Sequence, residues 1–110
     1  MRVHLIKERS IDTFCTGHQD RSVSFGIWLT KIKFAEWERP SDIKHTFKTA
    51  DILGKGSSRV VFNIGGDNYR MICKYYFGLK KVSLFICWIG THTEYSGICN
   101  KGIQNTIKVY

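Results

Sequence analysis

The sequence predicts an α+β fold in which an N-terminal helical hairpin packs on a small, mainly antiparallel sheet of three to four strands. Apolar residues recur at helical spacing in the first half of the chain, whereas β-branched and aromatic runs separated by turn residues fill the second half. The chain has 110 residues, a usual length for one domain. We therefore expect one domain over residues 1–110, with residues 97–110 as a C-terminal tail.

Two helices are expected before Pro40. Apolar residues within 25–37 recur every three or four positions with charged residues between them, as on an amphipathic helix, and Pro40 ends the pattern. A shorter helix is expected over residues 10–18, where the hydroxyl of Ser10 can cap its first turn. Residues 41–58 contain two glycines and paired serines and are expected to be irregular.

The strands follow this irregular segment. Residues 65–68 read Gly-Gly-Asp-Asn and suit a tight hairpin, because glycine and asparagine tolerate positive φ. The last apolar run lacks a polar face, as in a strand inside a sheet. The expected strands are Arg59–Ile64, Tyr69–Tyr75 and Val82–Ile89, with Arg2–Ile6 as a candidate fourth.

The three tryptophans are expected to be packing residues. Trp28 and Trp37 belong to the expected second helix and continue its apolar stripe. Strand alternation places Trp88 on the same face as Leu84 and Ile86.

The charge balance points to an anionic partner. Seventeen Lys and Arg against nine Asp and Glu give a formal net charge of +8, more than solubility requires. The longest apolar run, Leu84–Ile89, is far shorter than the ~20 residues that cross a bilayer. No secretory signal precedes the cysteines, so we expect a cytoplasmic protein without a membrane partner.

Neither a metal nor a cofactor is expected. His92-Thr93-Glu94 has the H-x-E form of zinc deaminases, but the downstream P-C-x-x-C of those enzymes is absent. Cys73, Cys87 and Cys99 have wide, irregular spacing, which favours buried free thiols, with structural zinc as the alternative.

Two cations of the second hairpin strand are candidates for contacting phosphate. Alternation along Tyr69–Tyr75 places Arg70 and Lys74 on one face, about 13 Å apart at ~3.3 Å per residue. A guanidinium binds phosphate oxygens bidentately, so Arg70 is the better candidate. The alternative is a solvated strand face.

A second candidate group follows the last expected strand. Gly90-Thr91-His92-Thr93-Glu94-Tyr95 places an imidazole and a phenol within three residues at the end of a rigid element. Histidine is the side chain best suited to proton transfer near neutral pH. The alternative is a surface histidine at a strand end.

Several segments in fixed order form a longer pattern than any of these motifs. This pattern resembles the HigB toxins, which belong to the RelE-like superfamily of toxin–antitoxin messenger-RNA endonucleases, over about residues 1–98. It consists of Met1-Arg2-Val3, Trp28, Ala35-Glu36-Trp37, Pro40–Lys44, Arg59-Val60-Val61-Phe62-Asn63-Ile64-Gly65-Gly66, Asn68-Tyr69-Arg70 and Gly90–Tyr95.

The resemblance implies a compact toxin that cleaves messenger RNA without a metal, typically on the translating ribosome. It also implies a helix-turn-helix antitoxin of the HigA type as partner. Arg70 matches the superfamily's phosphate-binding arginine, and His92 falls near a position where other members have arginine or histidine. Tyr95 lies near the place of a C-terminal residue that acts in proton transfer.

We assign His92 as general acid and Tyr95 as the base or as the group that orients the 2′-hydroxyl, with the two proton-transfer labels open to exchange. Arg70 with Lys74 would stabilise the phosphate oxygens. RelE has lysines at the positions of Val61 and Asn63, so a lysine base is not expected here.

Further cations would hold RNA and ribosome through their charge alone. The same charge fits a non-catalytic RNA- or ribosome-binding module equally well, and an inactive toxin relic that still binds its antitoxin is a third hypothesis. The RNA-binding candidates are Arg59, Lys44, Lys48, Lys80 and Lys81.

Overall fold

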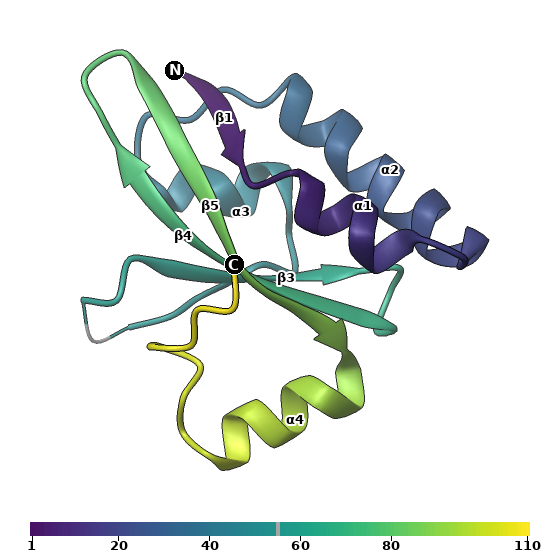
Figure 1. The fold of residues 1–110 in the computed structure, drawn as a ribbon. Coiled ribbons are helices and arrows are strands. Elements are labelled where there is room, and N and C mark those ends of the chain that lie inside the picture. Colours follow the sequence, from purple (N-terminus) through teal and green to yellow (C-terminus); the bar gives the residue numbers. More distant parts are fainter. Residues whose placement is uncertain (55) are drawn as a thin grey trace.

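The computed structural model describes residues 1–54 and 56–110, and these residues form a mixed α+β structure (Figure 1). A 3-10 turn over Pro40–Asp42 precedes the third helix. The elements in chain order are β1 (Arg2–Ile6), α1 (Arg9–Cys15), α2 (Gln19–Lys33), α3 (Ile43–Thr46), β2 (Asp51–Ile52), β3 (Arg59–Ile64), β4 (Tyr69–Phe77), β5 (Lys81–Thr91) and α4 (His92–Asn100).

The strands form one sheet in the order β1-β5-β4-β3-β2. Among the described strands only β1 runs parallel to its neighbour, so the prediction of a mainly antiparallel sheet is confirmed. The predicted number of three to four strands is wrong, because the described residues form five. The additional strand lies in the segment predicted to be irregular, where Asp51 and Ile52 pair with Val61 and Val60.

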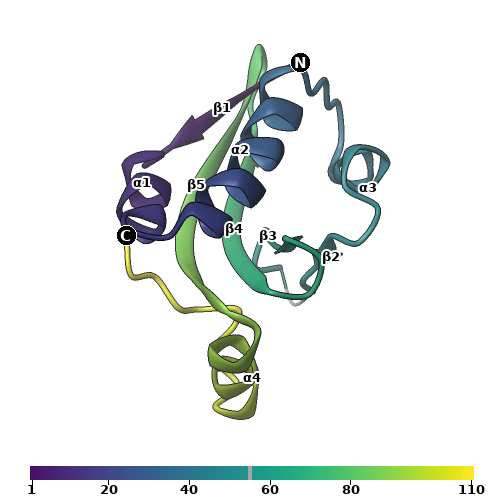
Figure 2. The same ribbon diagram turned by 90° about the vertical axis from the view of Figure 1, so that its right-hand side faces the viewer.

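The helices lie on both sides of this sheet. In two views at right angles, α4 lies apart from α1, α2 and α3, beyond the end of β5 (Figures 1 and 2). The larger core lies between the sheet and the N-terminal helices and includes Phe25 and Trp28 of α2 together with Phe62 of β3. The rings of Trp28 and Phe62 meet edge to face, with centroids 5.1 Å apart.

The helix bounds differ from the prediction. Helix α2 begins and ends earlier than the predicted 25–37. It ends early because the chain after it forms hydrogen bonds with the residues at the start of β1. The Trp37 amide donates a 2.9 Å hydrogen bond to the Met1 carbonyl, and Arg2 forms an antiparallel bridge with Glu36. Trp37 is nevertheless fully buried, so its predicted packing role is confirmed together with that of Trp28.

Ser10 does not cap α1. The N-cap position is Glu8, no side chain accepts a hydrogen bond there, and Ser10 lies inside the helix. The two helices still pack as neighbours, with the Phe14 and Phe25 ring centroids 5.6 Å apart.

A β-bulge in β5 divides the sheet into two differently covered faces. Ile72 pairs with Trp88 and the next residue, Cys73, pairs with Ile86, so Cys87 is an extra residue in β5. Because of this extra residue, the β5 side chains beyond it point to the opposite face of the sheet from the one that strict alternation would give. Trp88 therefore does not share a face with Leu84 and Ile86, and that prediction is wrong. It belongs to a second apolar cluster on the opposite face.

The second apolar cluster anchors the C-terminal part of the chain. Its buried members are Val61, Ile72, Cys87 and Trp88, and Tyr95 and Ile98 of α4 pack against them together with Ile107. The chain after α4 then returns across this face. The Arg59 guanidinium donates to the Ile107 carbonyl, and the Val109 amide donates to the Cys87 carbonyl at 2.7 Å.

The turn between β3 and β4 forms as predicted. Gly65 and Gly66 both have left-handed backbone, with φ of +65° and +66°. A Cβ atom on Gly65 would also lie 2.8 Å from the Ser24 hydroxyl of α2, whereas a Cβ atom on Gly66 would meet nothing within 4 Å. The turn is therefore fixed by backbone conformation and by its contact with α2.

We expect Gly65→Ala to lower the free energy of unfolding more than Gly66→Ala. Both substitutions place a side chain in the left-handed region, at a cost of about 1–2 kcal/mol. Only Gly65→Ala adds overpacking, which we expect to cost about 1 kcal/mol more. Urea denaturation of the two variants measures this difference, and equal stabilities would show that the turn does not press on α2.

Candidate functional site

The strand ends beside the β3–β4 turn bring the main candidate residues together. Arg70 pairs with Gly90 and Tyr69 pairs with Thr91, so the start of β4 lies next to the end of β5. The His92 amide then donates a 3.1 Å hydrogen bond to the Asn68 carbonyl of the turn. Arg70 and His92, which are 22 positions apart in the sequence, therefore lie beside the same short turn.

Arg70 is held in place by this turn. Its side chain is only 9% exposed, and Nη1 donates to the carbonyls of Tyr69 at 3.1 Å and of Asp67 at 3.2 Å. Nη2 lies 3.5 Å from a carboxylate oxygen of Asp67, whose side chain is 90% exposed. An exposed, hydrated carboxylate balances a buried cation incompletely, so an incoming phosphate can compete for this guanidinium.

His92 is the first residue of α4, and its neighbours define the helix start. The Thr91 hydroxyl accepts from the Glu94 amide at 3.2 Å, and a Glu94 carboxylate oxygen accepts from the Thr91 amide at 2.8 Å. This capping box explains Glu94 as a structural residue. Helix α4 was not predicted, although T-x-x-E at residues 91–94 is the usual signal for such a helix start.

The imidazole of His92 has no structural task of this kind. Its side chain is exposed, and among the described residues it takes part in no hydrogen bond or ion pair. Its backbone is fixed both by the helix start and by the bond to Asn68. A fixed backbone with an uncommitted imidazole is what proton transfer to a bound molecule requires.

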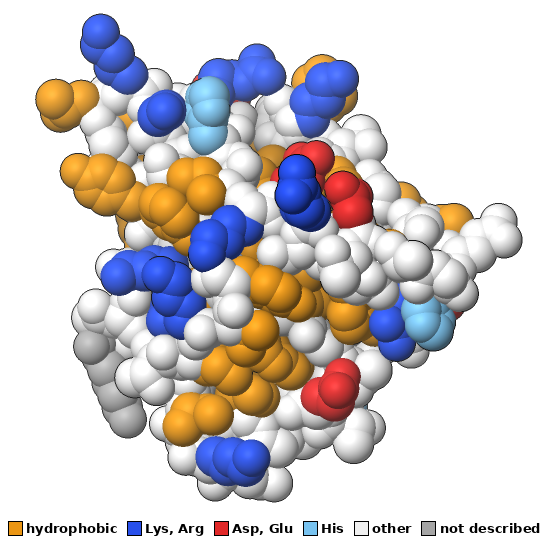
Figure 3. Space-filling view, in the orientation of Figure 1, with side chains coloured by type: hydrophobic (Ala, Val, Ile, Leu, Met, Phe, Trp, Pro, Cys, Tyr) orange, Lys and Arg blue, Asp and Glu red, His pale blue; other side chains and the backbone are white. Residues whose placement is uncertain are grey.

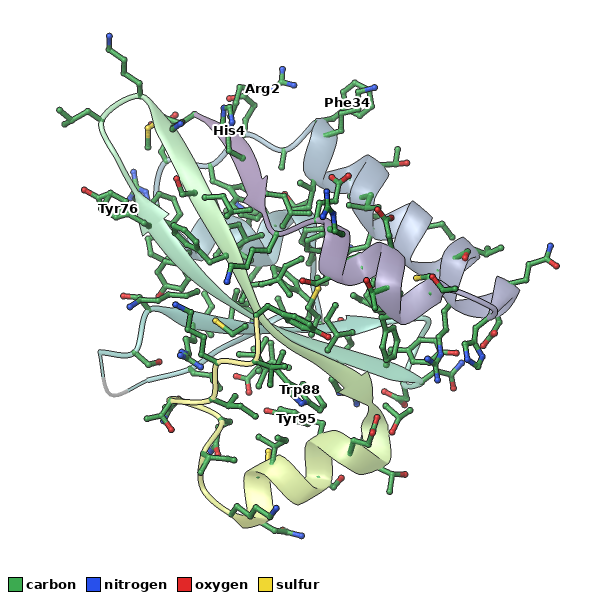
Figure 4. All side chains as sticks on the ribbon, viewed as in Figure 1. Arg2, His4, Phe34, Tyr76, Trp88 and Tyr95 are labelled. Atoms are coloured by element: carbon green, nitrogen blue, oxygen red, sulfur yellow. The ribbon has the colours of Figure 1, made fainter. Side chains whose placement is uncertain are left out.

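Tyr95 lies one turn further along α4 and faces the sheet. Its ring lies 6.2 Å from that of Trp88, and the two side chains point toward one another between β5 and α4 (Figure 4). Gly90 makes room for this arrangement, because a Cβ atom there would lie 2.4 Å from two atoms of the Trp88 indole. Gly90 is thus required by close packing.

Burial raises the pKa of the Tyr95 phenol well above its usual value, and a hydrogen bond with the Cys99 side chain and the charge of Asp51 add to this rise. The positive charge of Arg70 acts in the opposite direction. The phenol therefore keeps its proton at neutral pH, which favours Tyr95 as a hydrogen-bond donor over Tyr95 as a base.

Asn63 is a further candidate that the sequence analysis noted only as a departure from lysine. It pairs with Arg70 across the hairpin, and residues paired in this way share a face. Its amide supplies both a donor and an acceptor beside the guanidinium. We call Asn63, Arg70, His92 and Tyr95 the hairpin site.

Residues 22–98 match the model of HigB_toxin, the RelE-like toxic component of a toxin–antitoxin system. The chain belongs to the HigB toxin family. All four residues of the hairpin site lie within the matched segment. A search of curated proteins found no match. As a toxin of this family, the chain has an antitoxin as its partner.

Lys74 does not join the hairpin site of this HigB-family chain. It shares a face with Arg70 as predicted, but the fully buried Ile72 and the second apolar cluster lie between them. Lys74 instead pairs with Arg59 and lines a separate cavity of about 540 Å³.

The remaining RNA-binding candidates are distributed over the molecule. Lys44 lies on α3 and Lys48 follows that helix, whereas Lys80 and Lys81 lie at the β4–β5 turn, at the end of the hairpin remote from residues 65–68. Arg59 is buried and holds the C-terminal segment. These candidates therefore do not form one patch with the hairpin site.

The cysteines occur as free thiols, of which only Cys99 is exposed. Burial raises the pKa of Cys73 well above its usual value, so this thiol is unreactive. In the described part of the chain, no three His, Cys, Asp or Glu side chains come together as a metal site. No helix within the same residues is long and apolar enough to cross a membrane.

Gly90→Ala tests the packing that supports α4. We expect the free energy of unfolding to fall by about 1–3 kcal/mol, because the indole of Trp88 must move away from the new methyl group. Thermal and urea denaturation measure this effect.

Gly97→Ala is the matched control within α4. A Cβ atom there meets nothing within 4 Å, and alanine favours the helix, so stability should be unchanged or higher. A loss of stability in Gly97→Ala as large as that in Gly90→Ala would refute the packing argument.

Proposed function

We propose that this HigB-family chain is an endoribonuclease that cleaves messenger RNA by attack of the 2′-hydroxyl on the adjacent phosphorus, with no metal required. The observation that carries the proposal is that a buried, turn-anchored guanidinium, Arg70, and an exposed, uncommitted imidazole, His92, adjoin the same β3–β4 turn. A fixed cation and a proton-transfer group are the two requirements of this reaction. Membership of a RelE-like toxin family supports the same reaction class.

In the proposed reaction His92 accepts the proton of the 2′-hydroxyl while the 2′-oxygen forms a bond to phosphorus. The bond from phosphorus to the 5′-oxygen breaks, and that oxygen takes up the proton of the Tyr95 phenol, which solvent then replaces. The products are a 2′,3′-cyclic phosphate and a 5′-hydroxyl. Because the raised pKa of Tyr95 keeps its phenol protonated, we assign Tyr95 the donor role and His92 the base, reversing the first assignment.

Arg70 has a different role in this mechanism. Negative charge on the non-bridging oxygens grows as the fifth bond to phosphorus forms, and a guanidinium fixed before the reaction stabilises that charge without reorganisation. Only 9% of the Arg70 side chain is exposed, so its charge is weakly screened by solvent. Asn63, across the hairpin, would hold a phosphate or ribose oxygen.

The proposed function includes the place of cleavage in the cell and the molecules that the toxin binds. A net charge of +8 suits an RNA-rich partner, and we propose that cleavage takes place on translating ribosomes in the cytoplasm. The antitoxin would be a helix-turn-helix protein of the HigA type that covers the cationic surface.

His92→Ala and Arg70→Ala should each lower RNA cleavage by about 100-fold or more, because each removes a proton-transfer group or a charge contact made in the transition state. The measurement is growth after induced expression, with cleavage positions mapped by primer extension. Wild type should arrest growth and cut within translated frames, whereas the variants should do neither.

His18→Ala and Arg9→Ala are matched controls, since both residues are exposed and lie on the helical side of the molecule. Arg70→Lys retains charge but not the guanidinium, so it shows whether lost cleavage reflects chemistry or unfolding. Soluble wild type that neither arrests growth nor cuts RNA would favour the binding module or the relic. Cleavage retained in both alanine variants would refute the site.

A further inference from the structure

The face that carries the hairpin site also bears a concave surface near the other end of β4. This cavity of about 540 Å³ is within the usual size range of small-ligand sites. The returning C-terminal segment forms one wall, and β4 and β5 form another. We call it the basic pocket. It is lined by Ile6, Lys7, Arg59, Lys74, Tyr76, Phe85, Ile86, Cys87, Lys108 and Tyr110.

Four cations line the basic pocket, and its described lining includes no acidic side chain. Lys7, Lys74 and Lys108 are exposed at the rim, whereas Arg59 is buried and fixed to the Ile107 carbonyl. Lys7 also has left-handed backbone, with φ of +71°, which is uncommon and costly for a residue other than glycine. Positive charge gathered in a concave surface attracts anions.

Aromatic side chains complete the basic pocket. Tyr76 is 62% exposed and Phe85 is 37% exposed, and Tyr110 is half-buried on the C-terminal segment. In the left-central part of Figure 3, Lys and Arg side chains lie beside exposed hydrophobic side chains with no acidic side chain between them. Planar rings combined with cations are the usual composition of a single-stranded nucleic-acid site.

We propose that the basic pocket binds one nucleotide of the single-stranded RNA substrate, at a distance from the nucleotide that reacts. The base would stack on the exposed rings, and the phosphate would contact Lys74 and Lys108. Arg70 and Lys74 lie on the same face of β4, about 13 Å apart. Buried Ile72 and the returning C-terminal segment lie between these two residues, so an RNA strand with its reacting phosphate at Arg70 would cross the outer surface of that segment to reach the basic pocket.

This inference rests on the proposed function, so its test separates binding from cleavage. The probe is a fluorescently labelled single-stranded RNA with 2′-O-methyl groups throughout, which has no free 2′-hydroxyl to attack phosphorus. Fluorescence anisotropy with the full chain gives the dissociation constant and its salt dependence.

Two matched pairs of exposed residues give the readout. Tyr76→Ala should weaken RNA binding about fivefold or more by loss of stacking, whereas Phe34→Ala, at a residue that is 72% exposed on the helical side, should not. Lys108→Ala should reduce the slope of log K against log salt by about 0.7 for one lost phosphate contact, and Lys101→Ala should leave it unchanged.

The outcomes distinguish the two proposals. If wild type cuts RNA but all four variants bind the probe alike, the pocket is not an RNA subsite and the endoribonuclease proposal stands. If the variants differ as expected but wild type never cuts RNA, the nuclease proposal fails and the subsite stands. If a polyglutamate peptide binds with the same variant dependence and the RNA does not, the pocket is a protein-binding site and the inference is overturned.

Discussion

The extra residue at Cys87 in β5 is the constraint on which the rest of this structure depends. Without the bulge, Trp88 would continue the face of Leu84 and Ile86 and pack toward the N-terminal helices. With it, Trp88 lies on the other face and provides the surface on which Tyr95 packs. Helix α4 has an anchor on the sheet for this reason, and the anchor fixes where its first residue, His92, lies.

The motif Gly90–Tyr95 serves both the fold and the proposed chemistry. In Gly90–Tyr95, Gly90 makes room for the indole, while Thr91 and Glu94 close the helix start. These roles account for three of the positions that resemble other HigB toxins, and they leave the His92 imidazole uncommitted. A rigid frame around one free proton-transfer group is the arrangement expected of a preorganised site.

The sequence predicts the central hairpin best. Arg59–Ile64 is correct at both ends and the turn at 65–68 is present, because local turn chemistry and alternation decide both. The end of α2 was not predictable in this way, since it depends on the pairing of Arg2 with Glu36 across the fold. Strand β2 likewise exists through its pairing with β3 and has little pattern of its own.

The candidate site was predictable in part for the same reasons. Arg70, His92 and Tyr95 come from local motifs and the resemblance, and the structure brings them to one end of the sheet. The grouping of Lys74 with Arg70 assumed that an open strand face joins them. Buried Ile72 and the returning C-terminal segment separate them, and neither is visible from a strand pattern.

We propose the 2′-hydroxyl of RNA as the nucleophile at the hairpin site. The most direct test is mass spectrometry of the RNA ends formed by the purified toxin with translating ribosomes. We predict a 2′,3′-cyclic phosphate, or the 3′-phosphate formed by its opening, on one fragment and a 5′-hydroxyl on the other. Fragments with 3′-hydroxyl and 5′-phosphate ends would contradict attack by the 2′-hydroxyl.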